Sequence, residues 1–401
     1  MSVIDFSSLG NQVGESNTNP IELFSTLLNK KYDRLRPGQQ EVLKDWATKR
    51  KINRDIAIQM NTGSGKTLVG LLIAYSCLLE HQNPSVYLTP NRALAEQVAE
   101  EARCNGIPVT MEPGDTNFLS GSHILIATVQ KLFNGKSVFE HLDSGHFPLH
   151  CGCIVIDDCH SAIQILKNQF TLRIPQGSLT YQKLLALFSD DLKVEDPIKM
   201  EALLQESGYC SFLPLSLVAY FSKIDKVISV LSSSELLEVD DDYRFTFPLI
   251  SKSLKFASAT FSSKYIELIP RCPDVNFIQS YARSDHRIFL SATFSGLDEL
   301  TTELDADINR DSVISPSSAS DCGDRLIIAP RNISTQINDE DICAMVKGLT
   351  AKSNCEFING PINASVLVPS RRRAQFWHEN TGGTNCRQKQ YRLDRSTVVR
   401  W

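Results

Sequence analysis

The sequence predicts an α/β fold in which helices cover both faces of a parallel sheet. An apolar run at residues 56–59 leads into a glycine-rich loop, and an apolar pattern with helical spacing follows over residues 68–79. A second apolar run, residues 154–156, ends at two consecutive aspartates. Strands joined by crossover helices, with polar groups where the strands end, are typical of doubly wound sheets.

Composition indicates an ordinary soluble chain. The 401 residues are 42% hydrophobic and 22% charged, enough for two or three domains. No run approaches the ~18 apolar residues of a membrane span, and the N-terminus lacks the pattern of a signal peptide, so we expect a cytoplasmic protein without a membrane partner. Eleven scattered cysteines favour reduced thiols over a disulfide framework.

Net charge argues against a constitutively basic coat for nucleic acid. The formal net charge is −5 at pH 7. The balance is uneven, however, because residues 371–401 carry seven Arg and one Lys against two acidic residues. This basic, aliphatic-poor tail is either a disordered end or a nucleic-acid-binding segment.

The glycine-rich loop is a candidate phosphate cradle. Backbone N–H groups of Gly63, Ser64 and Gly65 can converge on phosphate oxygens at the positive end of the helix that follows. Lys66 is expected against the β- and γ-phosphates, and the hydroxyl of Thr67 is placed to bind Mg²⁺. The sequence therefore predicts ATP as the substrate and Mg²⁺ as the cofactor.

A second metal-binding group follows the strand at residues 154–156. We expect Asp157 to hold Mg²⁺ and Asp158 to orient or deprotonate the attacking water. Adjacent residues of a strand point to opposite faces, so the chain must leave the strand conformation at Asp157 for both carboxylates to serve one site.

Further motifs in the same order resemble those of the superfamily 2 DExD/H-box helicases. The segments are "YDRLRPGQQEVL" before the loop, "TGSGKT" in it, "YLTPNRALAEQ" (motif Ia), "ILIATVQKL" (motif Ib), "DDCH" (motif II), "FLSATF" (motif III) and "VLVPSRRR" (motif IV). Motif II has Asp158 where Glu is commoner, and Asn91 and Ala93 depart from motif Ia. The resemblance implies a RecA-like P-loop domain and a second RecA-like domain.

The resemblance also implies roles for individual residues. ATP contacts fall on Arg36, Gln39, Thr62, Gly63, Ser64, Gly65, Lys66 and Thr67, with Lys66, Asp157 and Asp158 catalytic. Coupling between the nucleotide site and motif III falls on His160, Ser291 and Thr293, and nucleic-acid contacts fall on Pro90, Arg92, Thr128, Ser370 and Arg371. The partner implied is DNA or RNA in single-stranded form, with DNA favoured by the "DDCH" form.

Some of these motifs have other interpretations. "KFASATF" at residues 255–261 is a second Ser-Ala-Thr site, although "FLSATF" follows a charged turn and an apolar strand and fits motif III better. The cluster His150, Cys151, Cys153, Cys159 and His160 could hold zinc. The strand at residues 154–156 would hold Cys153 and Cys159 about 20 Å apart if the segment were extended, which disfavours a single zinc site.

Motif spacing predicts the domain organisation. Residues 31–164 and 256–305 are expected to form the first RecA-like domain after an N-terminal segment, 1–30. Residues 165–255 are expected to be a mostly helical insertion, because the gap between motifs II and III exceeds one crossover. Residues 306–324 are expected to be a linker.

Residues 325–401 are expected to be a partial second RecA-like domain with a basic tail. Neither motif V nor motif VI is apparent after motif IV. We therefore expect an ATP-dependent helicase or translocase-type ATPase whose second domain could be completed by a protein partner. The alternative is a non-motor subunit or clamp that binds nucleic acid in response to nucleotide and does not unwind it.

Overall fold

The computed structural model describes residues 18–28, 30–135, 139, 148–204, 212–294, 296–317, 337–350, 365–368, 372, 375–377 and 397–400. The chain divides into two compact units, residues 1–322 and residues 323–401. Each unit is described by itself.

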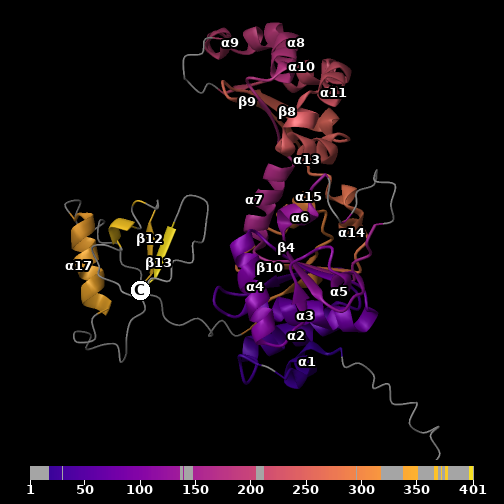
Figure 1. Ribbon diagram of the computed structural model, residues 1–401, viewed down its shortest axis with the longest axis vertical. Coiled ribbons are helices and arrows are strands. Elements are labelled where there is room, and N and C mark those ends of the chain that lie inside the picture. The colour runs from indigo at the N-terminus through magenta and orange to yellow at the C-terminus, as the bar shows by residue number, and fades with distance from the viewer. Residues whose placement is uncertain are drawn as a thin grey trace, which may run out of the picture. The chain divides into compact units, whose positions relative to one another are not determined.

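A seven-stranded parallel sheet forms the centre of the first unit (Figure 1). Its strand order is β11-β1-β10-β5-β2-β4-β3. The strands are β1 (Asp55–Gln59), β2 (Ser85–Thr89), β3 (Val109–Thr110), β4 (Ile124–Thr128), β5 (Cys153–Ile156), β10 (His286–Ser291) and β11 (Val313–Ile314). The α/β fold class with a parallel sheet is confirmed.

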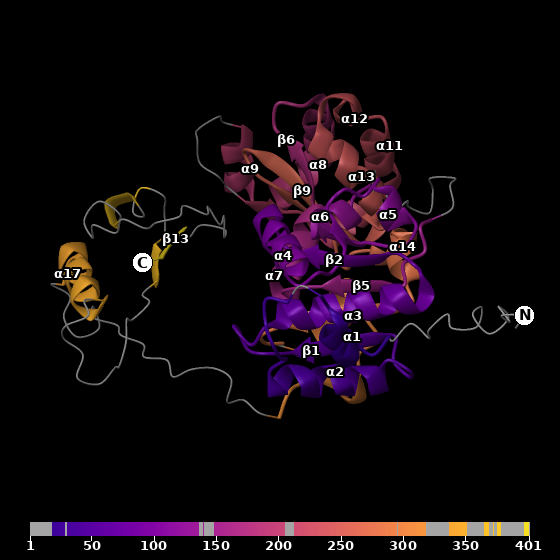
Figure 2. The same ribbon diagram turned by 60° about the horizontal axis from the view of Figure 1, so that its bottom comes forward.

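Helices cover both faces of this sheet. They are α1 (Pro20–Thr26), α2 (Pro37–Lys49), α3 (Lys66–His81), α4 (Arg92–Cys104), α5 (Thr116–Leu119), α6 (Val129–Leu132), α7 (Cys159–Gln169), α14 (Gln279–Ala282) and α15 (Asp298–Leu304). Residues of α1 to α4 share one hydrophobic cluster with one face of the strands, whereas residues of α5, α6, α7, α14 and α15 share another with the opposite face. Figure 2 shows α1, α2 and α3 close to β1.

Strand residues alternate between the two clusters with a period of two. On β1, Ile56 and Ile58 pack with α3, whereas Ala57 packs on the other side. Strands buried on both faces read as continuous apolar runs because both sets of side chains lie in the core. This burial explains the runs without polar alternation in the sequence.

The insertion after α7 holds a second sheet as well as helices. Its helices are α8 (Leu179–Glu195), α9 (Pro197–Leu204), α10 (Leu217–Ser222), α11 (Ile224–Ser232), α12 (Leu236–Val239) and α13 (Asp241–Ile250). Its antiparallel strands, in the order β6-β9-β8-β7, are β6 (Leu172–Pro175), β9 (Tyr265–Pro270), β8 (Ala257–Phe261) and β7 (Leu213–Pro214). These elements lie together at the top of Figure 1, beyond α7.

Three predicted boundaries differ from this structure. The insertion was expected to end at residue 255, whereas β8 and β9 extend its sheet to Pro270. Within residues 256–305, β10 is the strand that enters the large sheet. Within the expected linker, 306–324, Val313 and Ile314 form the edge strand β11 beside β1. In the N-terminal segment, Phe24 and Leu27 of the α1 region join the core.

In the second unit, the described residues include one helix and one pair of strands. They are α17 (Asp339–Thr350) and the antiparallel pair β12 (Ser365–Val368) and β13 (Thr397–Arg400). The "RLIIAP" segment, Ser370, Arg371 and most of the basic tail lie outside the described residues. Across the described part of both units, no helix has the length and apolar character to cross a membrane.

Candidate nucleotide-binding site

The carboxyl ends of five neighbouring strands bring the predicted motifs together. In the order β1-β10-β5-β2-β4, the strand ends carry the glycine-rich loop, Ser291, Asp157, Thr89 and Thr128. The register aligns these ends, since Gln59 lies beside Ser291 and Thr89 lies beside Thr128. Ligands of open α/β sheets bind at this edge.

The glycine-rich loop needs glycine at two positions. Gly63 and Gly65 both have φ +84°, in the left-handed region that residues with a Cβ rarely adopt. A Cβ on Gly65 would also lie 2.3 Å from Nε2 of Gln39. The loop can therefore present its backbone without side chains in the way.

Arg36 and Gln39 hold this loop from the start of α2. The Arg36 guanidinium donates to the carbonyl of Gly63 at 2.7 Å, and the Gln39 amide donates to the carbonyl of Gly65 at 3.2 Å. Gln39 in turn accepts from the Arg36 backbone N–H at 2.9 Å. The structure thus places both residues against the loop, and recognition of adenine by Gln39 stays a prediction.

Lys66 and Ser64 organise the loop from within. The ammonium of Lys66 donates to the carbonyls of Met60 and Asn61 at 2.9 and 3.2 Å, which holds it across the loop. The Ser64 hydroxyl donates to the Asn61 carbonyl at 2.6 Å. Lys66 also starts α3, so its charge lies beside the N-terminal N–H groups of that helix. Both sources of positive potential favour an anion.

Asp157 is half-buried at the end of β5 and is held by a tyrosine from the neighbouring strand. The hydroxyl of Tyr87 donates to Oδ2 of Asp157 at 2.9 Å, and the Asp158 N–H donates to Oδ1 at 2.9 Å. Burial raises the pKa of the Asp157 carboxyl, while Tyr87, the Asp158 N–H and the Lys66 charge act in the opposite direction. The Asp157 carboxylate therefore needs these three groups to stay deprotonated.

Motif reasoning missed Tyr87. Burial, followed by the charge of Asp157, raises the pKa of this phenol well above its ordinary value, so it stays a proton donor at neutral pH. The available signal was a lone aromatic hydroxyl in the apolar strand "SVYLT". Its partner could not be inferred without the register that sets β2 beside β5.

Asp158 adopts the left-handed conformation that the two adjacent acids require. Its φ is +50° and its ψ is 61°, between the end of β5 and the start of α7. The hydroxyl of Ser161 donates to its Oδ2 at 2.7 Å. Aspartate tolerates this region better than most residues with a Cβ. Because the chain turns at Asp158, the Asp157 and Asp158 side chains do not have to point to opposite faces of the sheet as they would in a strand.

The oxygen groups present fit a magnesium ion. The Tyr87 hydroxyl donates to Asp157, and Thr67 acts to lower the pKa of the same phenol, so both predicted ligands lie near this hydroxyl. A hydroxyl and a carboxylate are the hard oxygen donors that Mg²⁺ takes, with phosphate oxygens and water completing its shell. Mg²⁺ there would supply neutralisation of phosphate charge.

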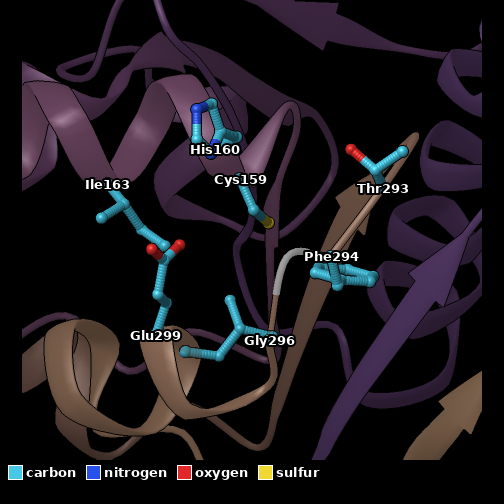
Figure 3. A pocket seen from close by; sticks show the side chains of 8 residues that line it. Cys159, His160, Ile163, Thr293, Phe294, Gly296 and Glu299 are labelled. Atoms are coloured by element: carbon cyan, nitrogen blue, oxygen red, sulfur yellow. The ribbon is translucent and has the colours of Figure 1, made fainter.

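Ser291 and Thr293 lie at the end of β10, between the loop and motif II. The Ser291 hydroxyl donates to the carbonyl of Thr293 at 2.7 Å, and the Ser291 carbonyl accepts from the Met60 N–H at 3.0 Å. Thr293 and His160 line one pocket, whose other lining residues are Cys159, Ile163, Phe294, Gly296, Glu299 and Leu300. Figure 3 shows His160 on α7 and Thr293 beyond β10 at the border of this pocket. Coupling through these groups stays a prediction.

The second Ser-Ala-Thr segment lies elsewhere. Ser258, Ala259 and Thr260 form part of β8 in the small sheet of the insertion, where they pair with β9. The later segment therefore occupies the position next to the loop, because β10 is the strand between β1 and β5.

The residues of motif Ia follow β2, which pairs with β5, and those of motif Ib lie on and after β4, which pairs with β2. Asn91 caps α4 by accepting from the Leu94 N–H at 3.0 Å, which explains its departure from the family pattern as a helix cap. Arg92 is 86% exposed and pairs with Glu96 at 3.1 Å. Pro90 is buried, and Thr128 is half-buried. The structure thus exposes Arg92 at this edge, and its contact with nucleic acid stays a prediction.

The run of cysteines and histidines does not form a metal site. Within the described ranges, no group of three His, Cys, Asp or Glu side chains comes together in a way that could hold an ion. Burial also raises the pKa of Cys151 to about 12 and that of Cys159 well above its ordinary value, which disfavours the thiolate that zinc needs.

Comparisons with known proteins agree over the first part of the chain. Residues 33–195 match the family described as "Type III restriction enzyme, res subunit". A stretch of 133 residues is 32% identical to the ATP-dependent DNA helicase Hel308 of Pyrococcus horikoshii and covers 31% of this chain. Among solved structures, Xpd4 of S. tokodaii is similar with a TM-score of 0.43 and 14% identity, and a structure titled "XPD_APO" with a TM-score of 0.37 and 15% identity.

The chain spans only part of each of these proteins. The match covers 18% of the length of the Hel308 protein. The structural matches cover 71% of this chain and 61% of Xpd4, and 68% of this chain and 56% of the second protein.

Proposed function

We propose that this chain, whose residues 33–195 match the type III restriction enzyme res subunit family, is a nucleotide hydrolase of the superfamily 2 helicase or translocase type. It binds Mg·ATP at residues 62–67 and Asp157. It binds the backbone of DNA or RNA, in single-stranded form, at the ends of β2 and β4.

The observation that carries this proposal is the strand order β1-β10-β5 at one sheet edge. It sets the glycine loop, the Ser291 hydroxyl and the pair of aspartates at neighbouring strand ends. Phosphoryl transfer needs little covalent chemistry from a protein, so positioning and charge stabilisation provide most of the catalysis. The loop positions the phosphates, and Lys66 stabilises charge on the β- and γ-phosphates.

Asp158 is proposed to prepare the attacking water. The left-handed turn directs its carboxylate away from the strand, and Ser161 fixes one oxygen while the other stays available to a water. A carboxylate within hydrogen-bond reach of water can orient it and accept its proton. Asp157 keeps a separate role at the metal because it is bonded to Tyr87 instead.

Strand β2 offers a physical link between the nucleotide and the nucleic acid. Its Tyr87 donates to Asp157, and two residues later its end begins the segment that presents Arg92. A strand fixed in a seven-stranded sheet moves little along its own length. A contact of nucleic acid with Arg92 can therefore affect the position of the Asp157 carboxylate through strand β2 and Tyr87.

A phosphate-release assay tests the proposal. We expect hydrolysis of ATP that requires Mg²⁺ and rises when single-stranded DNA or RNA is added. In Arg92→Ala, stimulation by the strand should fall while the basal rate is retained, because Arg92 lies outside the loop. Lys226→Ala serves as a control, since this lysine is exposed on α11 of the insertion, outside all of the assigned motifs.

Two other outcomes are informative. The chain could bind ATP without hydrolysing it, and its affinity for nucleic acid could depend on the bound nucleotide. This result would favour the non-motor clamp over the motor. Absence of ATP binding altogether would contradict the proposed site.

A further inference from the structure

The small sheet of the insertion has one face that its own helices leave open. On β9, residues 265, 267 and 269 alternate with buried residues and point to the same side, and the exposed Arg271 follows directly after the strand. Pairing places Arg173 of β6 beside Glu267 and Ser258 of β8 beside Ile269. The backbone N–H of Arg271 donates to the carbonyl of Phe256 at 3.1 Å, which continues the register past the strand end.

The opposite face is packed. Leu172 and Ile174 of β6, Ala259 of β8, and Ile266 and Leu268 of β9 belong to the large hydrophobic cluster. Helices α8, α10 and α13 contact the strands. The sheet is therefore covered on one side only, within the described residues.

The open face is less polar than an ordinary solvated face. Antiparallel sheets commonly show water a polar side. Here Ile269 is 39% exposed, and Tyr265 lies half-buried at the other end of β9. Phe256 is 71% exposed and lies beside this face, in the short 3₁₀ helix η2 (Leu254–Phe256) that leads into β8. Exposed apolar and aromatic side chains provide flat contact surfaces that a polar sheet face lacks.

The charges around these rings are mainly positive. Glu267 is the acid on this face, and its carboxylate is already held by the Arg173 guanidinium at 3.0 Å. Arg271 is exposed and has no side-chain partner among the described residues. The exposed Lys255 and Lys264 come directly before Phe256 and Tyr265. Each ring thus follows a cation directly in the sequence.

We propose that this face is a binding platform for single-stranded nucleic acid. Aromatic rings stack on bases of any sequence, and the cations between and beside them contact the phosphates. From Tyr265 to Arg271 the strand extends about 20 Å, enough for several extended nucleotides. The charge complementarity and the two basic-aromatic pairs favour a polyanion with flat bases over an apolar protein surface.

The proposal deepens the proposed function and rests on it for the class of partner. The platform lies in the insertion, outside motifs Ia and Ib. It adds a second contact to a strand that the core domain already binds, so its loss should weaken binding without removing ATP binding.

Fluorescence anisotropy with labelled oligo(dT) and oligo(rU) tests the platform in the full chain. Phe256→Ala should weaken binding of the oligonucleotide about fivefold or more, because it removes a stacking surface. Phe221→Ala is the matched control. Phe221 is 59% exposed on α10, a helix that packs on the covered side of the sheet, and its loss should leave the affinity unchanged.

A salt titration tests the charge. Arg271→Ala should weaken binding and make the dependence of log affinity on log salt shallower by about 0.7, the value for one phosphate contact on a single strand. Lys226→Ala, which removes an exposed cation of α11, should leave this slope unchanged. Circular dichroism should show that all four variants keep the parent fold.

Repeating the Phe256 and Phe221 comparison in Lys66→Ala separates this proposal from the proposed function. The difference between the two variants should persist even if ATP binding is lost or was never present. Equal oligonucleotide affinities for Phe256→Ala and Phe221→Ala, or no binding by the parent chain, would overturn the platform. Loss of self-association in Phe256→Ala, with oligonucleotide affinity intact, would also overturn it and assign the face to a second copy.

Discussion

Tyr87→Phe removes one oxygen from a fully buried position next to the carboxylate of Asp157, the proposed metal ligand. The ring keeps its packing between the strand and α3, so the change isolates the hydrogen bond of 2.9 Å to Oδ2 of Asp157. The Asp158 N–H at 2.9 Å and the nearby Lys66 charge remain to stabilise the Asp157 carboxylate. The variant therefore weakens one of three supports for the charged form.

The size of the effect follows from the charge on the acceptor. A hydrogen bond to a charged group contributes about 1.5–3 kcal/mol, and one pKa unit corresponds to about 1.36 kcal/mol. The two remaining groups compensate in part, so we expect the pKa of Asp157 to rise by about one unit. Because Mg²⁺ binds the deprotonated carboxylate, a higher pKa lowers the affinity for Mg²⁺ on the acidic side and leaves it near normal at high pH.

The assay is a titration of Mg²⁺ against ATP hydrolysis, or against binding of a fluorescent ATP analogue, at a series of pH values. In Tyr87→Phe the acidic limb should move to higher pH by about one unit. Tyr220→Phe is the control, because its buried hydroxyl donates to the Leu254 carbonyl at 3.0 Å in the insertion. Superimposable profiles for Tyr87→Phe and the parent would refute the positioning of Asp157 by this phenol.

Two further substitutions separate catalysis from stability. Asp158→Asn should stop turnover while Mg·ATP still binds, since asparagine also tolerates the left-handed turn; hydrolysis at the parent rate in a phosphate-release assay would remove Asp158 as the group that activates water. Arg287→Ala should lower the free energy of unfolding by about 3–5 kcal/mol in a urea titration, because it leaves the buried charge of Asp55 without its ion-pair partner. In the parent chain the Arg287 Nε donates to Asp55 at 2.7 Å. The exposed ion pair broken by Arg92→Ala should cost under about 1 kcal/mol, and equal losses for the two variants would contradict this reasoning.

The large sheet and the core of the site could be predicted from the sequence because their signals are local. A glycine loop between two apolar runs, and two acids after a third, fix where a strand ends and what lies there. The resemblance to superfamily 2 helicases is confirmed for the same reason, since the matched residues 33–195 contain these motifs. The roles of Gln39, His160 and Arg92 stay predictions.

The remainder depended on pairings between distant segments. Strand β6 pairs with β9 more than ninety residues later, so Leu172 lies beside Leu268 and no local pattern indicates it. Residues 313–314 look like part of a linker and become a strand only because β1 offers a free edge. The contact between Tyr87 and Asp157 follows from the pairing of β2 with β5, which cannot be inferred from the sequence alone.

Isothermal titration of Mg·ATP into the parent chain and into Lys66→Ala tests the central claim most directly. The Lys66 ammonium lies across the glycine loop, held by the carbonyls of Met60 and Asn61 at 2.9 and 3.2 Å. Its removal takes away a charge-assisted contact of about 1.5–3 kcal/mol, so the affinity should fall at least about tenfold. Lys226→Ala should bind as the parent does. Equal affinities for the parent and Lys66→Ala would contradict the assignment of this loop as the phosphate-binding site.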